Sequence, residues 1–363
     1  MRVKLGEVCE KKTSRYAQKD LVEVDGIYPV YGASGLIKYI DRYDQENEYV
    51  AVVKDGAGVG RTMLLPAQSS VIGTLQYILP KTGVCSKYLY YAIKNMHLEK
   101  YYTGATVPHI YFKDYQNEEF NLPDENHQRE VICVLDILEN LISCKAEQIQ
   151  RLDELIKARF IEMFGVYPDN PMGWEICTIR DIVKDVRYGS SRPAVDGGRY
   201  PYLRMNNITY GGELDLSDTK RIDIPDNELD KCAVRRGDVL FNRTNSKELV
   251  GKTCVYDRDE MMVLAGFVIR VRVTERVLPE FLSAFLNTDF SKQMLLGMCK
   301  TAIGQANINA QEMQNISLYL PPIELQQQFV QFKEQVDKSK VAIQKSLDET
   351  QLLFDSLMQE YFG

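Results

Sequence analysis

The sequence predicts an α+β protein with an internal repeat, in which two mixed β-rich modules are separated by two long helices that pair antiparallel. Two observations lead to this prediction: a residue pattern that occurs twice at constant spacing, and a long stretch without proline or glycine at the end of each copy. The 363 residues are enough for two domains that each bury a core. We therefore expect modules at residues 1–122 and 166–320, and helices at residues 123–165 and 321–363.

The repeat joins the end of each module to the helix that follows it. Equivalent residues lie 198 positions apart without a gap, a regularity that chance rarely produces and that indicates a duplicated unit. A weaker similarity with insertions precedes it, so the two modules are expected to share a fold. The clearest matches are Gln116 and Gln314, Leu122 and Leu320, Pro123 and Pro321, Gln128 and Gln326, and Phe164 and Phe362.

Apolar residues recur every seven positions in both long stretches, which is the period of helices that pack along one seam. Such helices would be roughly 55–60 Å long and need a partner to cover the seam. We expect the two copies to pair with each other about an internal two-fold axis. The axis is only approximate, because Lys333 and Lys340 stand where the first copy has Leu135 and Ile142. A helical hairpin that serves each neighbouring module separately is the alternative. The seam residues are Leu135, Ile142, Ile149, Ile156 and Met163, then Phe329, Val336, Ile343 and Leu357.

Both modules contain short apolar or alternating runs bounded by Gly, Pro, Asn and Asp, which is typical of β-strands. A shorter helix is expected after the strands of each module, near residues 86–101 and 279–298. The expected strands include residues 49–53, 74–79, 238–241 and 267–273.

Charge does not exclude nucleic acid as a partner, although the net charge is −7. The two modules are close to neutral, at +1 and −1, and the acidic excess lies in the two helical stretches. The eight cysteines form no Cys-x-x-Cys pair and there are only three histidines, so we expect no metal site. No apolar run is long enough for a membrane helix and no signal peptide is evident, so we expect a cytoplasmic protein without a membrane partner.

No catalytic motif stands out. The glycine-rich segment at residues 54–61 (KDGAGVGR) lacks the Gly-Lys-Ser/Thr ending of a phosphate-binding loop, and we interpret it as a turn between strands. Residues 169–174 (DNPMGW) contain Asn-Pro but not the rest of an amino-methyltransferase motif, and are interpreted as a linker. Binding is therefore favoured over catalysis, and we expect no catalytic residue and no cofactor bound by this chain.

Polar, turn-rich clusters supply the residue types that read base edges in DNA: Arg for guanine, Asn for adenine, and Ser or Thr for either. Each cluster alone is compatible with an ordinary loop. Equivalent loops with different polar tips are what two related readers of different sequences would need. The candidate DNA-binding residues are Tyr31, Ser34, Lys54, Arg61, Thr106 and His109 in the first module, and Tyr188, Ser190, Arg204, Asn206, Arg243, Asn245, Lys247, Gln305 and Asn307 in the second.

Both module-to-helix junctions, and several stretches within the modules, resemble type I restriction-modification specificity subunits. The similarity follows the duplicated order through essentially the whole chain. The stretches that carry it are residues 103–110 (TGATVPHI), 302–308 (AIGQANI), 318–327 (LYLPPIELQQ), 28–35 (YPVYGASG), 202–208 (YLRMNNI) and 237–246 (GDVLFNRTNS).

The resemblance implies a non-catalytic subunit whose two target-recognition domains each read one half of a split site in double-stranded DNA. The paired helices would fix the spacing of the half-sites and dock two adenine methyltransferase subunits, which motor-nuclease restriction subunits join for cleavage. S-adenosylmethionine, ATP and magnesium would then bind to those partners.

Two other classes stay open on the residues alone. The near-neutral modules also suit a protein-binding scaffold that holds peptides or sugars on a coiled coil. A self-contained methyltransferase with degenerate motifs is a further alternative. Salt-dependent DNA binding by the assembled complex would argue against the scaffold. Failure to bind S-adenosylmethionine would argue against the methyltransferase.

Overall fold

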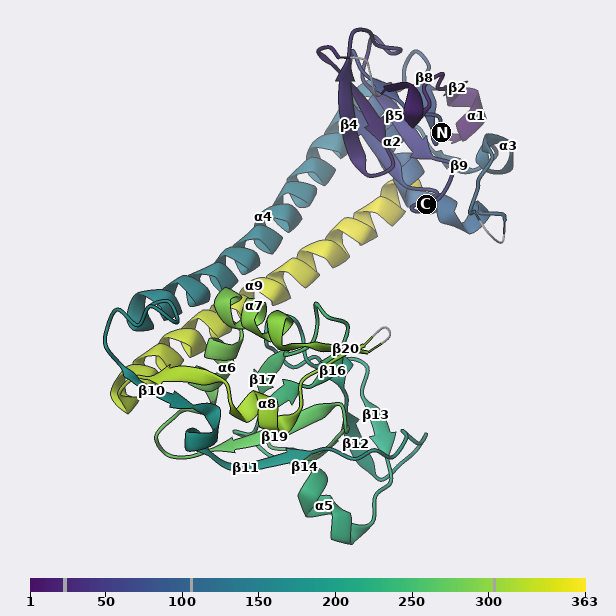
Figure 1. Cartoon of the computed structure of the whole chain (residues 1–363). Coiled ribbons are helices and arrows are strands. Elements are labelled where there is room, and N and C mark those ends of the chain that lie inside the picture. The colour runs from purple at the N-terminus through teal and green to yellow at the C-terminus, as the bar shows by residue number, and fades with distance from the viewer. Residues whose placement is uncertain (22–24, 105–106, 303–304) are drawn as a thin grey trace. The chain divides into compact units, whose positions relative to one another are not determined.

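The computed structural model describes residues 1–21, 25–104, 107–302 and 305–363 (Figure 1). The chain forms two compact units. Unit 1 contains Met1–Glu147 with Ile343–Gly363, and unit 2 contains Gln148–Ala342. Each unit therefore includes part of both long helices, α4 (Glu125–Phe164) and α9 (Ile323–Phe362). These helices confirm the two long helices that the sequence predicts.

Unit 1 is built around a four-stranded antiparallel sheet, beside which lies a smaller three-stranded sheet. In sheet order, the larger sheet contains β2 (Cys9–Thr13), β8 (Leu75–Pro80), β5 (Tyr49–Val53) and β6 (Thr62–Leu65). The smaller sheet contains β4 (Gly35–Ile40), β3 (Tyr28–Gly32) and β7 (Ser70–Val71). The remaining elements are β1 (Arg2–Lys4) paired with β9 (Glu119–Asn121), α1 (Leu5–Val8), α2 (Ser86–Asn95), α3 (Phe112–Tyr115), and the 3-10 turns Gln18–Leu21 and Leu98–Tyr101.

Strand β5 explains why unit 1 has two apolar layers. Its five residues are all buried, and successive side chains of a strand point to opposite faces. Val50 and Val52 pack in a cluster with α2 and with side chains of α4 and α9. Tyr49, Ala51 and Val53 pack in a second cluster with the smaller sheet. The larger sheet is thus covered by helices on one face and by strands on the other.

Unit 2 repeats the strand order of the larger sheet, whereas its second sheet has four strands in place of three. Its larger sheet contains β11 (Val183–Tyr188), β19 (Val268–Val273), β15 (Val239–Asn242) and β17 (Thr253–Val255), and its second sheet contains β13 (Lys220–Ile222), β12 (Tyr200–Leu203), β18 (Met262–Leu264) and β14 (Ala233–Val234). In both larger sheets, the first strand and the last strand before the helix are neighbours, and β12 pairs parallel to β18 as β3 pairs parallel to β7. This shared topology confirms the repeat within the modules.

The remaining elements of unit 2 complete the cover of its sheets. The expected helix at residues 279–298 is in fact two helices, because the chain breaks after Leu286 and Thr288 caps the second helix through its side-chain oxygen. The elements are α5 (Asp226–Cys232), α6 (Pro279–Leu286), α7 (Asp289–Met298), α8 (Ala310–Gln314), β10 (Glu175–Thr178) paired with β22 (Ser317–Leu320), a small sheet of β16 (Thr244–Asn245), β21 (Gln305–Asn307) and β20 (Lys300–Ala302), and the 3-10 turns Ile179–Ile182 and Met205–Asn207.

The two long helices pair antiparallel. Within unit 2, Phe160 of α4 packs edge-to-face against Phe329 of α9 at a ring distance of 5.2 Å, and Lys340 Nζ lies 2.6 Å from Asp153 Oδ1. Residue number therefore falls along α9 as it rises along α4. In unit 1, Lys145 Nζ donates hydrogen bonds to the Ser346 and Thr350 side chains at 2.8 and 2.6 Å. The copies pair with each other, as predicted, and not as separate hairpins.

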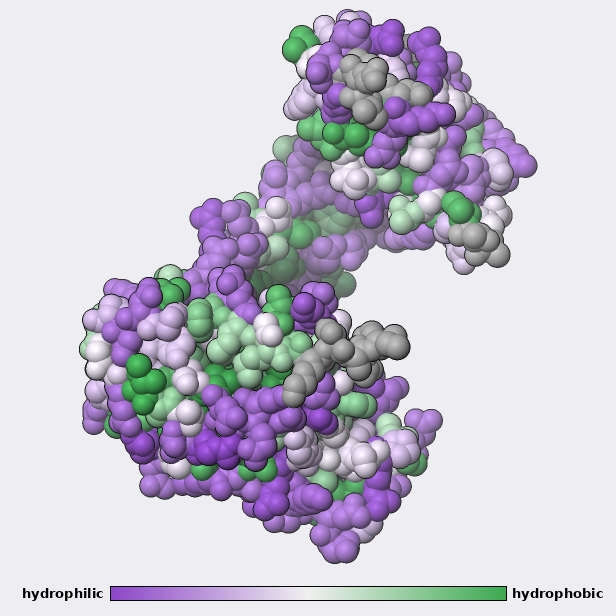
Figure 2. All heavy atoms as spheres, in the orientation of Figure 1, coloured by the Kyte–Doolittle hydropathy of each residue, from purple (hydrophilic) through white to green (hydrophobic). Residues whose placement is uncertain are grey.

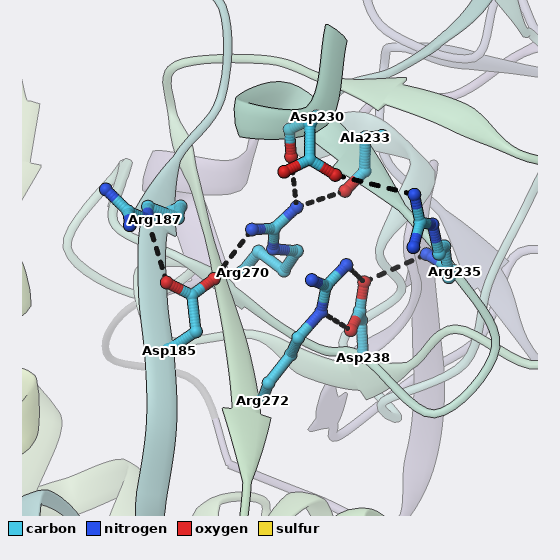
Figure 3. A network of polar contacts seen from close by, with 8 residues as sticks. All are labelled: Asp185, Arg187, Asp230, Ala233, Arg235, Asp238, Arg270 and Arg272. Atoms are coloured by element: carbon cyan, nitrogen blue, oxygen red, sulfur yellow. Dashed lines mark hydrogen bonds and ion pairs between the residues drawn. The ribbon is translucent and has the colours of Figure 1, made fainter.

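Strand β19 of unit 2 carries a charged face (Figure 3). Ile269 and Val271 belong to the apolar cluster with α6 and the long helices, whereas Arg270 and Arg272 point to the opposite face. Arg270 is 3% exposed and lies 2.7 Å from Asp185. Asp238 is similarly buried and accepts from Arg272 Nε at 2.7 Å. This network occupies the side of the sheet where α5 lies.

Each buried charge of the network has several partners, although Arg270 Nε has none among the described residues. Arg270 Nη1 also donates to the backbone carbonyl oxygens of Asp230 and Ala233, at the end of α5. Burial raises the pKa of the Asp185 carboxyl, but hydrogen bonds from Arg270 and Arg187 outweigh burial and lower that pKa below its ordinary value. The network therefore ties α5 to the sheet through paired charges.

Candidate nucleic-acid interface

Three segments of unit 1 meet at one end of its larger sheet: the β3–β4 turn, the β5–β6 loop and residues 107–111. Arg61 Nη1 donates to the Ala33 carbonyl oxygen at 2.9 Å, which joins the first two loops. The Asp55 carboxylate is hydrogen-bonded to Nδ1 of the His109 ring. Gly56 N donates to the Pro108 carbonyl oxygen at 2.9 Å. Side chains that are distant in sequence are thereby held together.

The glycine-rich segment at residues 54–61 connects β5 to β6, which confirms its interpretation as a turn between strands. Gly60 has a φ of +87°, and a Cβ at this position would lie 2.5 Å from the Glu99 backbone nitrogen. Only glycine allows the backbone to pass this close. The glycines thus shape the loop that carries Lys54 and Arg61.

The candidate residues of unit 1 differ in exposure. Ser34 and Arg61 are exposed, while Lys54 and His109 are half-buried, with Lys54 Nζ 3.8 Å from Asp55 Oδ2. Tyr31 packs against the second apolar cluster of unit 1, and its pKa is raised by burial and secondarily by Tyr39. Tyr31 therefore belongs as much to the core as to the surface. Thr106 lies outside the described residues.

In unit 2, three candidate residues make direct contact. The Arg243 guanidinium lies over the Tyr188 ring, 4.9 Å from its centroid, and Arg243 Nη2 donates to Asn307 Oδ1 at 3.1 Å. Asn307 Nδ2 in turn donates to Thr244 Oγ1 at 3.2 Å, and the Tyr188 hydroxyl accepts from the Ala310 amide at 2.9 Å. We call Tyr188, Arg243 and Asn307 the arginine cluster.

The backbone around the arginine cluster comes from the small sheet of β16, β21 and β20. Asn245 pairs with Ala306 in this sheet, and its side-chain oxygen accepts from the Ser246 amide at 2.9 Å. Lys247 is exposed in the loop that follows. Gln305 pairs with Ala302, but its side chain lies outside the described part of the structure. The cluster is thus mounted on a sheet and not on a free loop.

Two candidate residues of unit 2 are held by structural contacts. Ser190 is 5% exposed and its hydroxyl accepts from the Arg192 amide at 3.2 Å, so it is buried and not displayed as expected. Arg204 donates through Nη2 to the carboxylate of Asp218 at 2.8 Å and to its carbonyl oxygen at 3.0 Å. Asn206 is exposed beside it on the 3-10 turn Met205–Asn207.

Two residues outside the sequence candidates lie at these sites. Asp55 orients His109, and the Tyr111 ring lies tilted against His109 at a ring distance of 4.2 Å. Asp55 directly follows Lys54, but no pattern in the sequence indicates that its carboxylate meets a histidine 54 positions later. Tyr111 carried a weak signal, as an aromatic residue two positions from a candidate histidine.

Among the described residues, no group of three or more His, Cys, Asp or Glu side chains is placed to hold a metal ion. The helices within the described ranges include none that is both long and apolar enough to cross a membrane.

Comparison with known proteins shows where this architecture occurs. The model of the type I restriction modification DNA specificity domain matches residues 1–154 and again residues 171–350. The chain is 27% identical over 182 residues to the type I restriction enzyme EcoKI specificity subunit of Escherichia coli (strain K12), covering 49% of this chain and 39% of that protein. It is 25% identical over 196 residues to the putative type I restriction enzyme MjaX specificity subunit of Methanocaldococcus jannaschii, covering 53% and 46%. The matched part thus spans less than half the length of these relatives.

Solved structures agree in fold. The type I restriction-modification system S subunit from M. genitalium superposes with a TM-score of 0.60 at 14% identity, covering 100% of this chain and 96% of that one. A structure from work on complex assembly and conformational transition of the type I R-M system superposes with a TM-score of 0.58 at 17% identity. It covers 99% of this chain and 97% of that one. Because the family model matches twice and covers most of the chain, this protein belongs to the family of type I restriction modification DNA specificity domains.

Proposed function

We propose that this chain is the sequence-specific DNA-binding subunit of a type I restriction-modification complex, and that each unit reads one half of a bipartite site. The observation that supports this most is the arginine cluster, in which a guanidinium and an amide are fixed side by side. These are the groups that recognise guanine and adenine in the major groove. Family membership supports the same function.

The arginine cluster suits base reading because its geometry is set before DNA arrives. Tyr188 supports the face of the Arg243 guanidinium and Asn307 holds one of its nitrogens, so little side-chain freedom is left to lose. Arg243 Nε is buried and has no hydrogen-bond partner within the described part of the structure. One good bidentate contact of this kind discriminates bases by about 1–3 kcal/mol.

Unit 1 would read its half-site with different chemistry. The contact with Asp55 occupies His109 Nδ1, so Nε2 is the ring nitrogen that would face a base edge. Arg61 and Lys54 supply positive charge at the same loops, suited to phosphate contacts that give salt-dependent affinity. Exposed Ser34 in unit 1 and exposed Asn206 in unit 2 would add polar contacts to DNA. Thr106 and Gln305 remain candidates for such contacts.

The methyltransferase and motor-nuclease subunits would bind the S-adenosylmethionine, ATP and magnesium, so this chain would need no catalytic residues of its own. The complex would act in the cytoplasm. A docking surface for two methyltransferase subunits is supported by the helices. In unit 1, Val134, Ile137 and Leu141 share one face of α4 and are 38%, 55% and 44% exposed. A contiguous exposed apolar stripe of this kind favours a protein partner.

The decisive experiment is co-expression with the partner adenine methyltransferase, followed by genome-wide mapping of methylated adenine. We expect a split motif that disappears when this gene is deleted. DNA binding by the assembled complex should weaken steeply with salt. Unchanged methylation together with no complex formation would favour a protein-binding scaffold, and binding of S-adenosylmethionine by this chain alone would favour a methyltransferase.

A further inference from the structure

The turn between β18 and β19 presents an aromatic side chain to solvent. All thirteen phenylalanines of the chain lie within the described residues, and Phe267 is the only one that is exposed, at 51%. An exposed phenyl ring gives up the favourable transfer from water that the other phenylalanines gain. On the face that Figure 2 shows, hydrophilic residues cover most of unit 2 and leave smaller hydrophobic areas between them. Phe267 is therefore the phenyl ring that is accessible to a binding partner.

The backbone that carries Phe267 is fixed by hydrogen bonds to two neighbouring segments. Gly266 N donates to the Ser190 carbonyl oxygen at 2.7 Å, and Ser190 N donates to the Leu264 carbonyl oxygen at 2.7 Å. A Cβ at Gly189 would lie 2.1 Å from that same Leu264 oxygen, so the segments pass in close contact. Buried Ser190 therefore holds the turn, and Phe267 is displayed on rigid backbone.

Phe267 is also tied directly to the arginine cluster. Arg243 N donates to the Phe267 carbonyl oxygen at 3.0 Å, and the Arg243 carbonyl oxygen accepts from Ile308 N, next to Asn307, at 2.9 Å. The phenyl ring and the cluster therefore stand on hydrogen-bonded neighbours. A DNA groove that meets Arg243 would also come close to this ring.

We propose that Phe267 is a specificity-determining residue that contacts the 5-methyl group of a thymine in the half-site read by unit 2. This inference rests on the proposed function. Arginine and asparagine read base edges in the major groove, and the thymine methyl is the apolar group of that groove. An adenine that is methylated in duplex DNA is itself paired with thymine, so the site offers at least one such methyl.

The test uses the full chain assembled with its methyltransferase partner. In duplexes that carry the mapped site, each thymine of the half-site that responds to Arg243→Ala is replaced in turn by deoxyuridine, which lacks only the methyl group. Dissociation constants are measured by fluorescence anisotropy. At one position the wild-type complex should bind about fourfold more weakly, as expected for one methyl-sized apolar group.

The variant decides whether Phe267 causes this loss. Phe267→Ala should bind the thymine and deoxyuridine duplexes equally, because the apolar partner is gone. Phe267→Leu should keep part of the discrimination. Since the side chain is exposed, neither substitution should impair folding, and amide hydrogen exchange of β19 checks this.

Several results would overturn the proposal while leaving the DNA-reading function intact. One is an equal deoxyuridine effect in wild type and Phe267→Ala, and another is a unit 2 half-site without a methyl-dependent position. Altered DNA bending without methyl dependence would make the ring a wedge between bases. Loss of complex assembly in Phe267→Ala would place a protein partner on it. If the wild-type complex binds no specific duplex, the proposed function itself fails.

Discussion

The larger sheets of the two units share one strand order, but the faces turned away from the long helices differ in composition. In unit 1 the face away from the long helices carries Tyr49 and Tyr77, packed with Val30 in an apolar cluster. The corresponding face of β19 in unit 2 carries Arg270 and Arg272, which pair with aspartates. The opposite faces, which pack on the long helices, are apolar in both units. On the charged face of unit 2, Leu240 and Val268 still pack in an apolar cluster with the second sheet. The topology therefore accommodates buried ion pairs beside an apolar layer.

The loops at the candidate interfaces differ in the same way. Unit 1 joins Arg61 to the β3–β4 turn and pairs His109 with Asp55, whereas unit 2 stacks Arg243 on Tyr188. Each arrangement is fixed by its own local partners. Duplication of the fold followed by divergence of the tips would let one chain read two different half-sites.

Removal of the buried arginine gives the largest effect that we expect from this comparison. Arg270→Ala leaves Asp185 without its buried partner and the Ala233 carbonyl oxygen without its donor. We expect the free energy of unfolding of unit 2 to fall by about 3–5 kcal/mol. Hydrogen exchange of the β15 and β19 amides measures it, and the β5 and β8 amides of unit 1 should keep most of their protection.

Arg187→Ala is the matched control, because Arg187 bonds the other oxygen of the same Asp185 at 2.8 Å but is 55% exposed. An exposed pair contributes little, so we expect a loss below about 1 kcal/mol. Equal losses for the two variants would show that burial does not explain the role of Arg270.

A smaller effect should separate the two units in recognition. Arg243→Ala should relax one or two base positions in one half of the methylated motif by about 1–3 kcal/mol and leave the other half unchanged. Arg61→Ala, in unit 1, should affect only the other half-site. Methylated-adenine mapping with each variant provides the measurement. A uniform loss over both halves would identify Arg243 as a structural residue or a general phosphate contact.

The sequence predicts the fold of this chain well because its signals are periodic or repeated. The heptad residues Leu135 and Phe329 are fully buried in the structure, and the expected strand at residues 49–53 coincides with β5. In the region of residues 279–298 the sequence predicts one helix, but Thr288 caps the start of a second helix there. Local side-chain hydrogen bonds of this kind have no periodicity.

The candidate site was harder to predict because its contacts join distant segments. Arg243 and Asn307 are 64 positions apart, and a small sheet that the sequence did not indicate brings them together. The polarity of Ser190 predicts a DNA contact. However, Gly189 lets the backbone of this segment approach β18 closely, and Ser190 is buried. An apolar residue at the start of an expected strand is usually a core residue, so the sequence does not predict that Phe267 is exposed.

Acid should reveal a last and smaller difference between the units. Lowered carboxyl pKa values are found at two residues of unit 1, and at seven of unit 2, among the described residues. Those of unit 1 are Glu118 and Asp124. Those of unit 2 are Asp181, Asp185, Asp215, Glu228, Glu248, Asp259 and Glu275.

A carboxyl group with a lowered pKa in the folded state stabilises the fold fully above its ordinary pKa of about 4, and this contribution is lost as the pH falls through the folded-state value. Between about pH 5 and pH 2, the amide protection of unit 2 should therefore fall more than that of unit 1. Most of these groups are exposed, so high salt should reduce the difference. Asp185 is the exception, because its partner Arg270 is buried. In Asp185→Asn the salt-resistant part of the acid effect should disappear, and its persistence would show that the charged layer of unit 2 is not its source.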